Sequence, residues 1–307
     1  MSDAHPGRGD DGSPDGGDPA AQPRARLADL GVAAYDGPRG GVAVAVAALA
    51  THTARRLLGL GRRPRAKLVP LAVLALAYIP AVAFLGVAVL VPEELSALLT
   101  LDVRTLLSTI TVAVAVFVAL TGPEALCPDR RHGTLTLYLA SGLSPATYLL
   151  AKAAAVAAVL LAVTLGPALL LEAGSALVGL GPEGALASVA RLGRVAAAGA
   201  VLAGVYTAVG LAAASLTDRH AVASGLVIAV LLGSNIGVGL LDAAVAAPAW
   251  LPLLSLVTAP LELVDRLLGT TGEVAGVATT RVVAANLGWL AVLGGLAWWR
   301  HDRVRPS

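Results

Sequence analysis

Six long apolar segments dominate the pattern of hydrophobic and polar positions along the chain. A helix rises about 1.5 Å per residue, so about 20 residues cross the roughly 30 Å hydrocarbon layer of a bilayer. The segments are too long and too uniformly apolar for the strands of a membrane barrel. The pattern therefore predicts an all-α fold, a polytopic membrane protein with six transmembrane helices. These helices are expected over residues 70–91, 105–121, 150–171, 195–216, 221–241 and 282–299.

A basic segment with helical spacing precedes the first apolar segment. Apolar residues such as Leu49 and Leu57 recur on one side of a helix drawn over residues 42–63. Such a helix typically lies in the membrane interface with its apolar face in lipid. The alternative is a seventh span, but the uninterrupted apolar run covers only residues 41–50. We expect an interfacial amphipathic helix within residues 41–66, with His52, Arg55, Arg56, Arg62 and Arg63 on its polar face.

The remaining segments complete the predicted organisation. Residues 1–40 are rich in Gly, Asp and Pro, and are expected to form a disordered or extended tail. Residues 67–300 would form the six-span domain and residues 301–307 a short C-terminal tail. The connection over residues 242–281 is half apolar. Short helices dipping into the outer leaflet between residues 245 and 270, or a plain outer loop, both fit this pattern.

Composition supports the membrane class. Hydrophobic residues make up 57% of the chain and charged residues only 14%, against about 25% in soluble domains. With both termini in the cytoplasm, thirteen Lys and Arg residues flank cytoplasmic ends of the spans and five flank outer ends. This bias favours that orientation. The strong preference for Arg over Lys, with abundant Ala and Gly, suggests a bacterial inner-membrane protein.

The residues that several classes of protein need for their function are absent from this sequence. The six predicted spans hold no Asp, Glu, Lys, Arg or His apart from Lys152, whereas ion-coupled transporters usually keep such groups near the midplane. The sequence has no phosphate-binding loop of the G-x-x-x-x-G-K-[ST] type and no metal-ligand spacing. Basic residues form no aromatic-studded stripe, so a nucleic-acid partner is not expected. Cys127 is the single cysteine, which excludes an intrachain disulfide.

The link between the second and third spans carries a distinctive pattern over residues 122–150. Glu124 opens it, a charged group from Asp129 to His132 follows, and Gly133 interrupts the chain. A cationic loop bearing leucines can place them in a groove of a partner and surround them with charge. The alternative for Arg130 and Arg131 is that they only set topology. Ser144 and Pro145 read as the N-cap and first residue of the third span.

Two segments resemble the permease subunit of ATP-binding-cassette transporters of the ABC-2 type. One is YDGPR at residues 35–39, and the other is DRRHGTLTLYLASGLSPATYLLAKAAAV at residues 129–156. Gly142 and Ala151 depart from the family pattern, where proline and glycine are common, and Pro145 stands where a basic residue is common. The matching positions are Glu124, Asp129, Arg130, Gly133, Thr134, Leu135, Leu137, Leu139, Leu143, Ser144, Tyr148 and Lys152, with Arg131 inside the same run.

The resemblance implies a separate ATPase partner, with transport across the membrane assigned to this chain and ATP hydrolysis to the partner. Two permeases, identical or different, meet in the bilayer, and each pairs with a separate ABC ATPase subunit that binds ATP and Mg. This chain would bind no cofactor and would not be an enzyme. The loop 122–150 would carry the coupling helix that docks on the ATPase, and helices between residues 245 and 270 would re-enter from outside.

Two other readings remain open at this point. The chain could be a non-transporting multi-span scaffold or a regulatory protein that keeps the same architecture. An intramembrane enzyme is a third reading, disfavoured by the missing titratable residues. A neighbouring gene for a separate nucleotide-binding subunit would favour transport, and the sequence itself names neither substrate nor direction.

Overall fold

The computed structural model describes one compact unit within residues 40–307. The description leaves out residues 61–64, 91–101, 135–137, 139–142, 180, 183, 245–247, 271, 275 and 303–307, and the side chains of 65, 66 and 69. The predicted tail over residues 1–39 also lies outside the described residues. In this part of the chain every regular element is a helix.

Six of these helices are long and apolar enough to cross a membrane, which confirms the predicted number of spans. They are α2 (Arg65–Leu90, apolar from Pro70), α4 (Val103–Arg131), α6 (Pro145–Leu177), α7 (Ala185–Leu216), α8 (His220–Ala244) and α10 (Thr279–Asp302). The shorter helices with described bounds are α1 (Val42–Leu57), the 3-10 helix η1 (Leu251–Leu254) and α9 (Thr258–Leu268).

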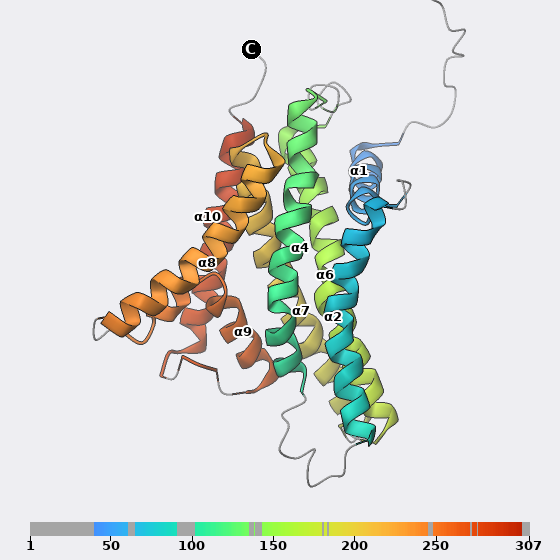
Figure 1. The fold of residues 1–307 in the computed structure, drawn as a ribbon, viewed down its shortest axis with the longest axis vertical. Helices are drawn as coiled ribbons and strands as arrows, with labels where there is room; N and C mark the ends of the chain where they lie inside the picture. The colour runs from blue at the N-terminus through green and yellow to red at the C-terminus, as the bar shows by residue number, and fades with distance from the viewer. Residues whose placement is uncertain are drawn as a thin grey trace, which may run out of the picture. The chain divides into compact units, whose positions relative to one another are not determined.

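Helix α7 lies at the centre of the arrangement and contacts α4, α6, α8, α9 and α10. Helices α1 and α2 pack on the α4–α6 side, and α8 and α10 lie on the other side (Figure 1). The apolar stretch of α7 is 67% buried, against 17% for α2 and 22% for both α8 and α10. The outer helices therefore expose apolar side chains, which suits contact with lipid or with another membrane subunit.

The central helices approach closely at glycine positions. A Cβ atom added to Gly122 of α4 would lie 2.9 Å from the Cα atom of Gly210 in α7. Small residues allow this backbone contact, which drives helix association where lipid offers no hydrophobic advantage. The Thr164 hydroxyl of α6 donates a hydrogen bond to the Gly199 carbonyl of α7 across 3.1 Å. Together these contacts join α4 and α6 to the central helix.

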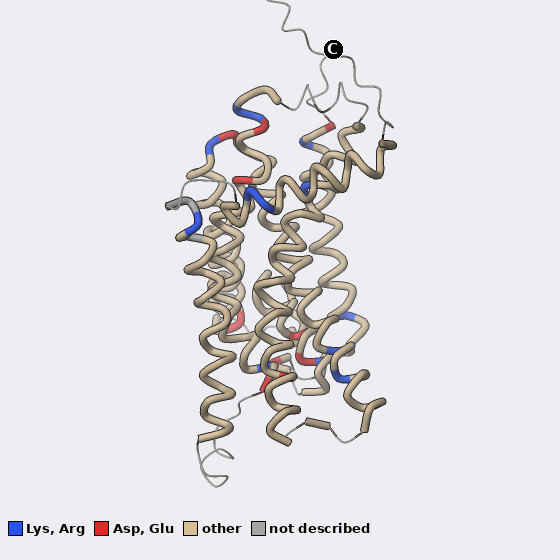
Figure 2. Tube along the Cα trace, turned by 90° about the vertical axis from the view of Figure 1, so that its right-hand side faces the viewer, with Lys and Arg blue, Asp and Glu red and all other residues tan. Residues whose placement is uncertain are grey.

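Several helices extend beyond the bounds that the apolar segments predicted. The predicted boundary between the second span and its loop is therefore wrong. The second span continues through residues 122–131, which were expected to belong to the loop. The spans also take in charged residues that the predicted bounds excluded, among them Asp129, Glu172 and Arg191. Figure 2 shows the charged residues gathered toward the two ends of the bundle, with an uncharged band between them. The expected lack of charge therefore holds for the middle of the helices and not for their ends.

The predicted amphipathic helix is α1, which ends at Leu57 and runs across the direction of α2, α4 and α6 (Figure 1). With 16 residues it is too short to count among the candidate spans, so the alternative of a seventh span is not supported. Arg62 and Arg63 lie outside the described residues.

The connection between α8 and α10 contains η1 and α9, so short helices rather than a plain loop fill it. The Asn235 side chain of α8 anchors this connection, because its Oδ1 atom accepts hydrogen bonds from the hydroxyls of Ser255 and Thr258. Asn286 of α10 donates to the Ala259 carbonyl across 2.9 Å. These contacts hold the short helices against the bundle.

Candidate functional site

The end of α4 forms the base of the loop that leads to α6. Gly133 has a φ of +67°, a left-handed conformation that glycine adopts at no steric cost. The Gly133 N–H donates to the Arg130 carbonyl, and the Thr134 N–H donates to the Asp129 carbonyl. This pair of bonds is the Schellman motif, which satisfies the last carbonyls of a helix. Gly133 therefore ends the helix, and the surface loop begins there.

The start of α6 follows the predicted chemistry. The Ser144 side chain accepts a hydrogen bond from the Thr147 N–H across 3.2 Å, and Pro145 occupies the first turn. A serine N-cap followed by proline satisfies an unpaired N–H and fixes the backbone for helix entry. Residues 132–144 therefore connect α4 to α6, a shorter connection than the predicted 122–150.

Beneath this loop, two side chains of α6 converge on one carboxylate of α4. The Lys152 Nζ atom lies 2.6 Å from Asp129 Oδ2, and the Tyr148 hydroxyl donates to the same oxygen across 2.8 Å. Lys152 and Tyr148 are each 1% exposed and Asp129 is 4% exposed. Groups as polar as these are buried only when they are paired. The ion pair therefore fixes the loop-side ends of α4 and α6 to each other.

Arg56 brings the transverse helix α1 into the same cluster. Its Nη1 atom lies 3.6 Å from Asp129 Oδ1, and its Nη2 atom donates to the backbone carbonyl of Glu124 across 2.6 Å. A guanidinium presents several donors in a fixed plane, so it can hold a carboxylate and a carbonyl at once. We call Arg56, Asp129, Tyr148 and Lys152 the polar anchor. It connects α1, α4 and α6 at one end of the bundle.

Aromatic rings enclose the polar anchor. The Tyr138 and Tyr148 ring centroids lie 5.6 Å apart, and Lys152 Nζ lies 5.9 Å and 5.5 Å from the two rings. Cations at this distance from an aromatic ring are attracted to it. Burial, with a further contribution from Asp129, raises the pKa of Tyr138 above its ordinary value. The Tyr138 phenol therefore stays protonated at physiological pH. The ring centroid of His301 in α10 lies 6.1 Å from that of Tyr148, with the two rings tilted relative to each other.

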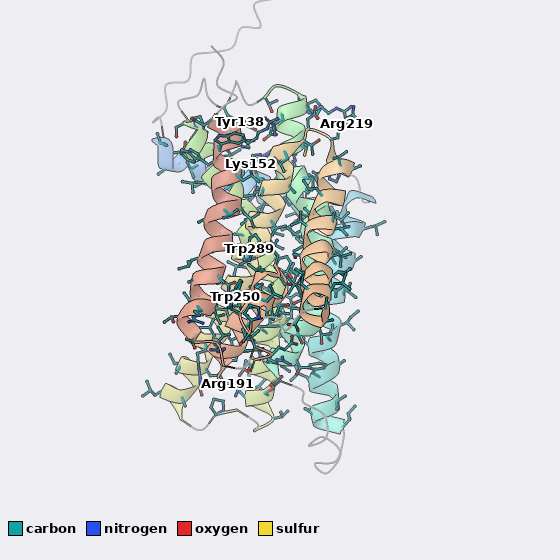
Figure 3. The ribbon with its side chains drawn as sticks, turned by 90° about the vertical axis from the view of Figure 1, so that its left-hand side faces the viewer. Tyr138, Lys152, Arg191, Arg219, Trp250 and Trp289 are labelled. Carbon is teal, nitrogen blue, oxygen red and sulfur yellow. The ribbon has the colours of Figure 1, made fainter. Side chains whose placement is uncertain are left out.

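Arg130 points to a different neighbour. One of its terminal amino groups donates to the backbone carbonyl of Ser215, at the end of α7. Cys127 also contacts this end, with its thiol 3.4 Å from the Thr217 carbonyl. The last two turns of α4 are thus tied to α7 as well as to α1 and α6. Figure 3 places Tyr138, Lys152 and Arg219 near this end and Arg191 near the opposite one.

The structure separates the sequence-predicted site residues into groups. Asp129, Leu143, Tyr148 and Lys152 are buried in the described part of the chain. Arg131, Gly133, His52 and Arg55 are exposed, while Glu124, Arg130, Thr134 and Arg56 are half-buried. Leu135, Leu137 and Leu139 lie outside the described residues.

Sequence reasoning placed Arg56 on the polar face of α1 but not beside Asp129, and it missed Tyr138 and His301. Arg56 and Asp129 are separated by more than seventy positions, so no local spacing could indicate the contact. The C-terminal end of α4 did carry a signal, because basic residues followed by glycine are typical of a helix C-terminus.

The contacts of this site join helices to one another. Among the residues that the structure describes, no group of three or more His, Cys, Asp and Glu side chains could hold a metal ion. In the polar anchor two cations, Arg56 and Lys152, share the single carboxylate of Asp129. The geometry of the anchor suits the transmission of a displacement from the loop into α1, α4 and α6.

The bundle of six candidate membrane-spanning helices, with the polar anchor joining α1, α4 and α6 at one end, defines a polytopic membrane protein. A family model described as ABC-2 family transporter protein matches residues 99–299, about two-thirds of the chain. The chain therefore belongs to the ABC-2 family of transporter proteins. Membership makes the chain a membrane-embedded component of a transporter. Among curated proteins, none matches this sequence.

Proposed function

We propose that this chain is the permease subunit of an ATP-binding-cassette exporter, powered by a separate ATPase subunit that docks on the loop between α4 and α6. ATP and Mg would bind to that partner and not to this chain. The observation that carries the proposal is the polar anchor directly beneath the loop. Asp129 joins a buried lysine, a buried tyrosine and the arginine of α1 at the point where an external motor would push.

The loop connects two long helices that pack against each other. The loop is joined at both ends to helices that run the thickness of a bilayer, α4 with 29 residues and α6 with 33. Close-packed interiors transmit displacement rather than absorb it. A partner that moves the loop would therefore move both helices together, and Arg56 would draw α1 with them. Without the buried pair, the ends of α4 and α6 could slide independently.

The proposed orientation puts the loop, both termini and α1 on the cytoplasmic side of a bacterial inner membrane. The excess of Lys and Arg at this end supports it. A second permease, identical or different, would complete the pathway. The exposed apolar faces of α2, α8 and α10 leave room for such a neighbour. The uncharged middle of the bundle suits a substrate that is largely apolar.

The exposed loop residues provide the test. Arg131→Glu and His132→Glu reverse or add charge at exposed positions and spare the buried anchor. The measurement is ATP hydrolysis by a co-expressed ABC ATPase encoded beside this chain, together with co-purification of the two. We expect the double variant to lower co-purification at least several-fold, because charge reversal at an interface disfavours association.

Arg219→Glu is the matched control, since Arg219 is an exposed arginine at the same end but outside this loop. It should leave co-purification unchanged. Equal loss in both variants, or no loss in either, would contradict docking on the loop. A chain that stays in the membrane but never co-purifies with such an ATPase would favour the scaffold reading.

A further inference from the structure

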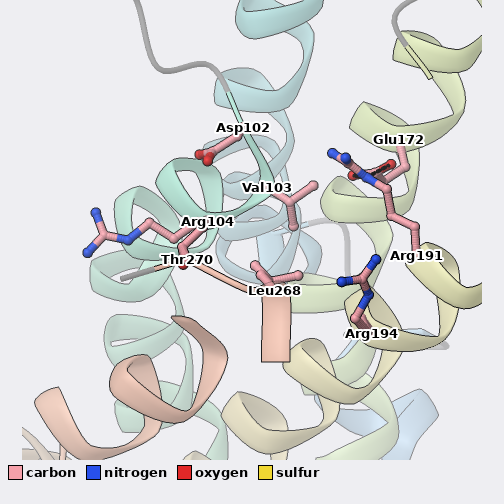
Figure 4. A pocket seen from close by; sticks show the side chains of 8 residues that line it. All are labelled: Asp102, Val103, Arg104, Glu172, Arg191, Arg194, Leu268 and Thr270. Atoms are coloured by element: carbon pink, nitrogen blue, oxygen red, sulfur yellow. Dashed lines mark hydrogen bonds and ion pairs between the residues drawn. The ribbon is translucent and has the colours of Figure 1, made fainter. Parts of the chain in front are cut away.

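A charged cavity lies at the opposite end of the bundle, where the start of α4 meets α6, α7 and the end of α9. Its volume is about 180 Å³. Drug-sized ligands usually occupy pockets of about 300–1,000 Å³, so this one suits a single small group. Its polar lining is contributed mainly by Asp102, Arg104, Glu172, Arg191 and Arg194 (Figure 4). None of these residues takes part in the polar anchor.

The arginines of this cavity are not equivalent. Arg104 pairs with Asp265, with 2.8 Å between Nε and Oδ1. Arg191 places its Nε atom 2.9 Å and 2.8 Å from the two carboxylate oxygens of Glu172. In the part of the chain that the structure describes, Arg194 forms no ion pair. Its guanidinium is therefore the uncompensated cation of the cavity.

Arg191 contributes further hydrogen-bond donors beside Arg194 at the cavity. Arg191 and Arg194 are three positions apart on α7, so their side chains share one face of the helix. Arg191 bonds Glu172 through Nε alone, which leaves its two terminal amino groups without a hydrogen bond within the described residues. Figure 4 shows Arg194 extending toward the space between Leu268 and the Glu172–Arg191 pair.

Asp102 is an acidic residue of the lining that forms no ion pair among the described residues. Its negative charge is stabilised by the N-terminus of helix α4. The Asp102 carboxylate accepts a hydrogen bond from the Thr105 N–H across 2.8 Å and caps the helix. A carboxylate in this position is stabilised by the positive end of the helix dipole. Arg104 and Arg191 are each paired with an acid, which leaves Arg194 as the cation of the lining that has no ion pair among the described residues.

The depth of the cavity in the bundle indicates where its ligand would come from. Along α6, about 20 residues separate Lys152 of the polar anchor from Glu172, a rise of about 30 Å. That length equals the hydrocarbon thickness of a typical bilayer. The two charged clusters therefore mark the two boundaries of the apolar layer. In a bilayer placed on this apolar layer, the cavity would lie beside the lipid head groups, and Val103 and Leu268 form its apolar walls.

We propose that this cavity binds a phosphate group, held by the guanidinium of Arg194 and the terminal amino groups of Arg191. Guanidinium groups match phosphate oxygens in geometry and charge. The group could belong to a lipid head group or to a soluble phosphate. Binding at this site requires no ATPase partner, so it can fail or succeed independently of the proposed function.

The test measures binding to the full-length chain purified in neutral detergent, by thermophoresis with three probes. Short-chain phosphatidic acid supplies phosphate on a lipid, dioctanoylglycerol supplies the lipid without phosphate, and inorganic phosphate supplies the anion alone. We expect phosphatidic acid to bind and dioctanoylglycerol not to bind. Arg194→Gln should weaken phosphatidic acid binding about tenfold or more, since it removes a charged hydrogen-bond donor to the phosphate.

Two further variants make the result specific. Arg194→Lys keeps the charge and should recover part of the affinity. Arg281→Gln removes another exposed arginine, one that lines a different, apolar groove, and should change nothing. Competition by inorganic phosphate at similar concentration would assign the site to a soluble phosphate, and its absence would assign it to lipid. Equal binding in wild type and Arg194→Gln, or tight dioctanoylglycerol binding, would overturn the proposal.

Discussion

Lys152 shows how one residue can carry a structural role that its position in the sequence conceals. A lysine near the start of a span is usually read as a topology signal. Here its ammonium group is almost fully buried and lies 2.6 Å from Asp129. A buried charge is tolerated because its partner is in place, and it becomes costly when that partner is lost. The same residue therefore bears on both orientation and helix packing.

Asp129→Asn should destabilise the protein by about 3–5 kcal/mol, because it leaves the buried ammonium of Lys152 without its counter-charge. The double variant Asp129→Asn with Lys152→Met removes both charges and should recover much of that loss. Thermal unfolding of the purified chains in detergent measures the difference. If the double variant loses as much as the two single variants added together, the two residues are not energetically coupled.

Helix α4 shows what an element gains from its neighbours. Residues 122–131 contain Gly122, Pro123 and Pro128 together with four charged residues, a composition that argues against a helix interior. Yet Ala125, Leu126 and Cys127 are nearly completely buried against the rest of the bundle. Tertiary packing outweighs the weak local propensity here, and the helix extends until Gly133 ends it.

The crossing of α4 and α7 can be tested with two alanine substitutions. Gly122→Ala places a Cβ atom 2.9 Å from the backbone of Gly210, so the helices must separate, at a cost of about 1–3 kcal/mol. Gly204→Ala, on α7, meets nothing within 4 Å. It should be neutral or stabilising by up to about 1 kcal/mol. The apparent unfolding temperature measures both, and equal effects would show that the close approach is unimportant.

The whole molecule has two different ends. One holds the polar anchor and the loop, and the other holds the phosphate-sized cavity and the short helices η1 and α9. The gathering of charge toward both ends follows from the cost of placing a charge inside hydrocarbon (Figure 2). Which end faces the cytoplasm decides whether an ATPase can reach the loop.

Single-cysteine labelling in intact cells tests this orientation. The chain has one cysteine, Cys127, and Cys127→Ser provides the background. Glu273→Cys and His132→Cys place exposed thiols at the two ends. A membrane-impermeant maleimide should label residue 273 in intact cells, and residue 132 only after permeabilisation. The opposite pattern would place the loop outside and remove the basis of the proposed docking.

The sequence by itself determined the number of spans, the transverse helix and the cap of α6. Bilayer thickness fixes the length of an apolar segment, and the chemistry of Ser144 and Pro145 is local. It also carried the family resemblance in residues 129–156. Only the tertiary structure decided that Asp129, Tyr148 and Lys152 lie inside, and that Arg56 reaches them from α1. It also decided that α4 continues past its apolar segment, and that Arg194, unlike Arg104 and Arg191, has no ion-pair partner among the described residues. Burial and charge pairing depend on contacts between distant parts of the chain, which helical spacing and hydropathy do not record.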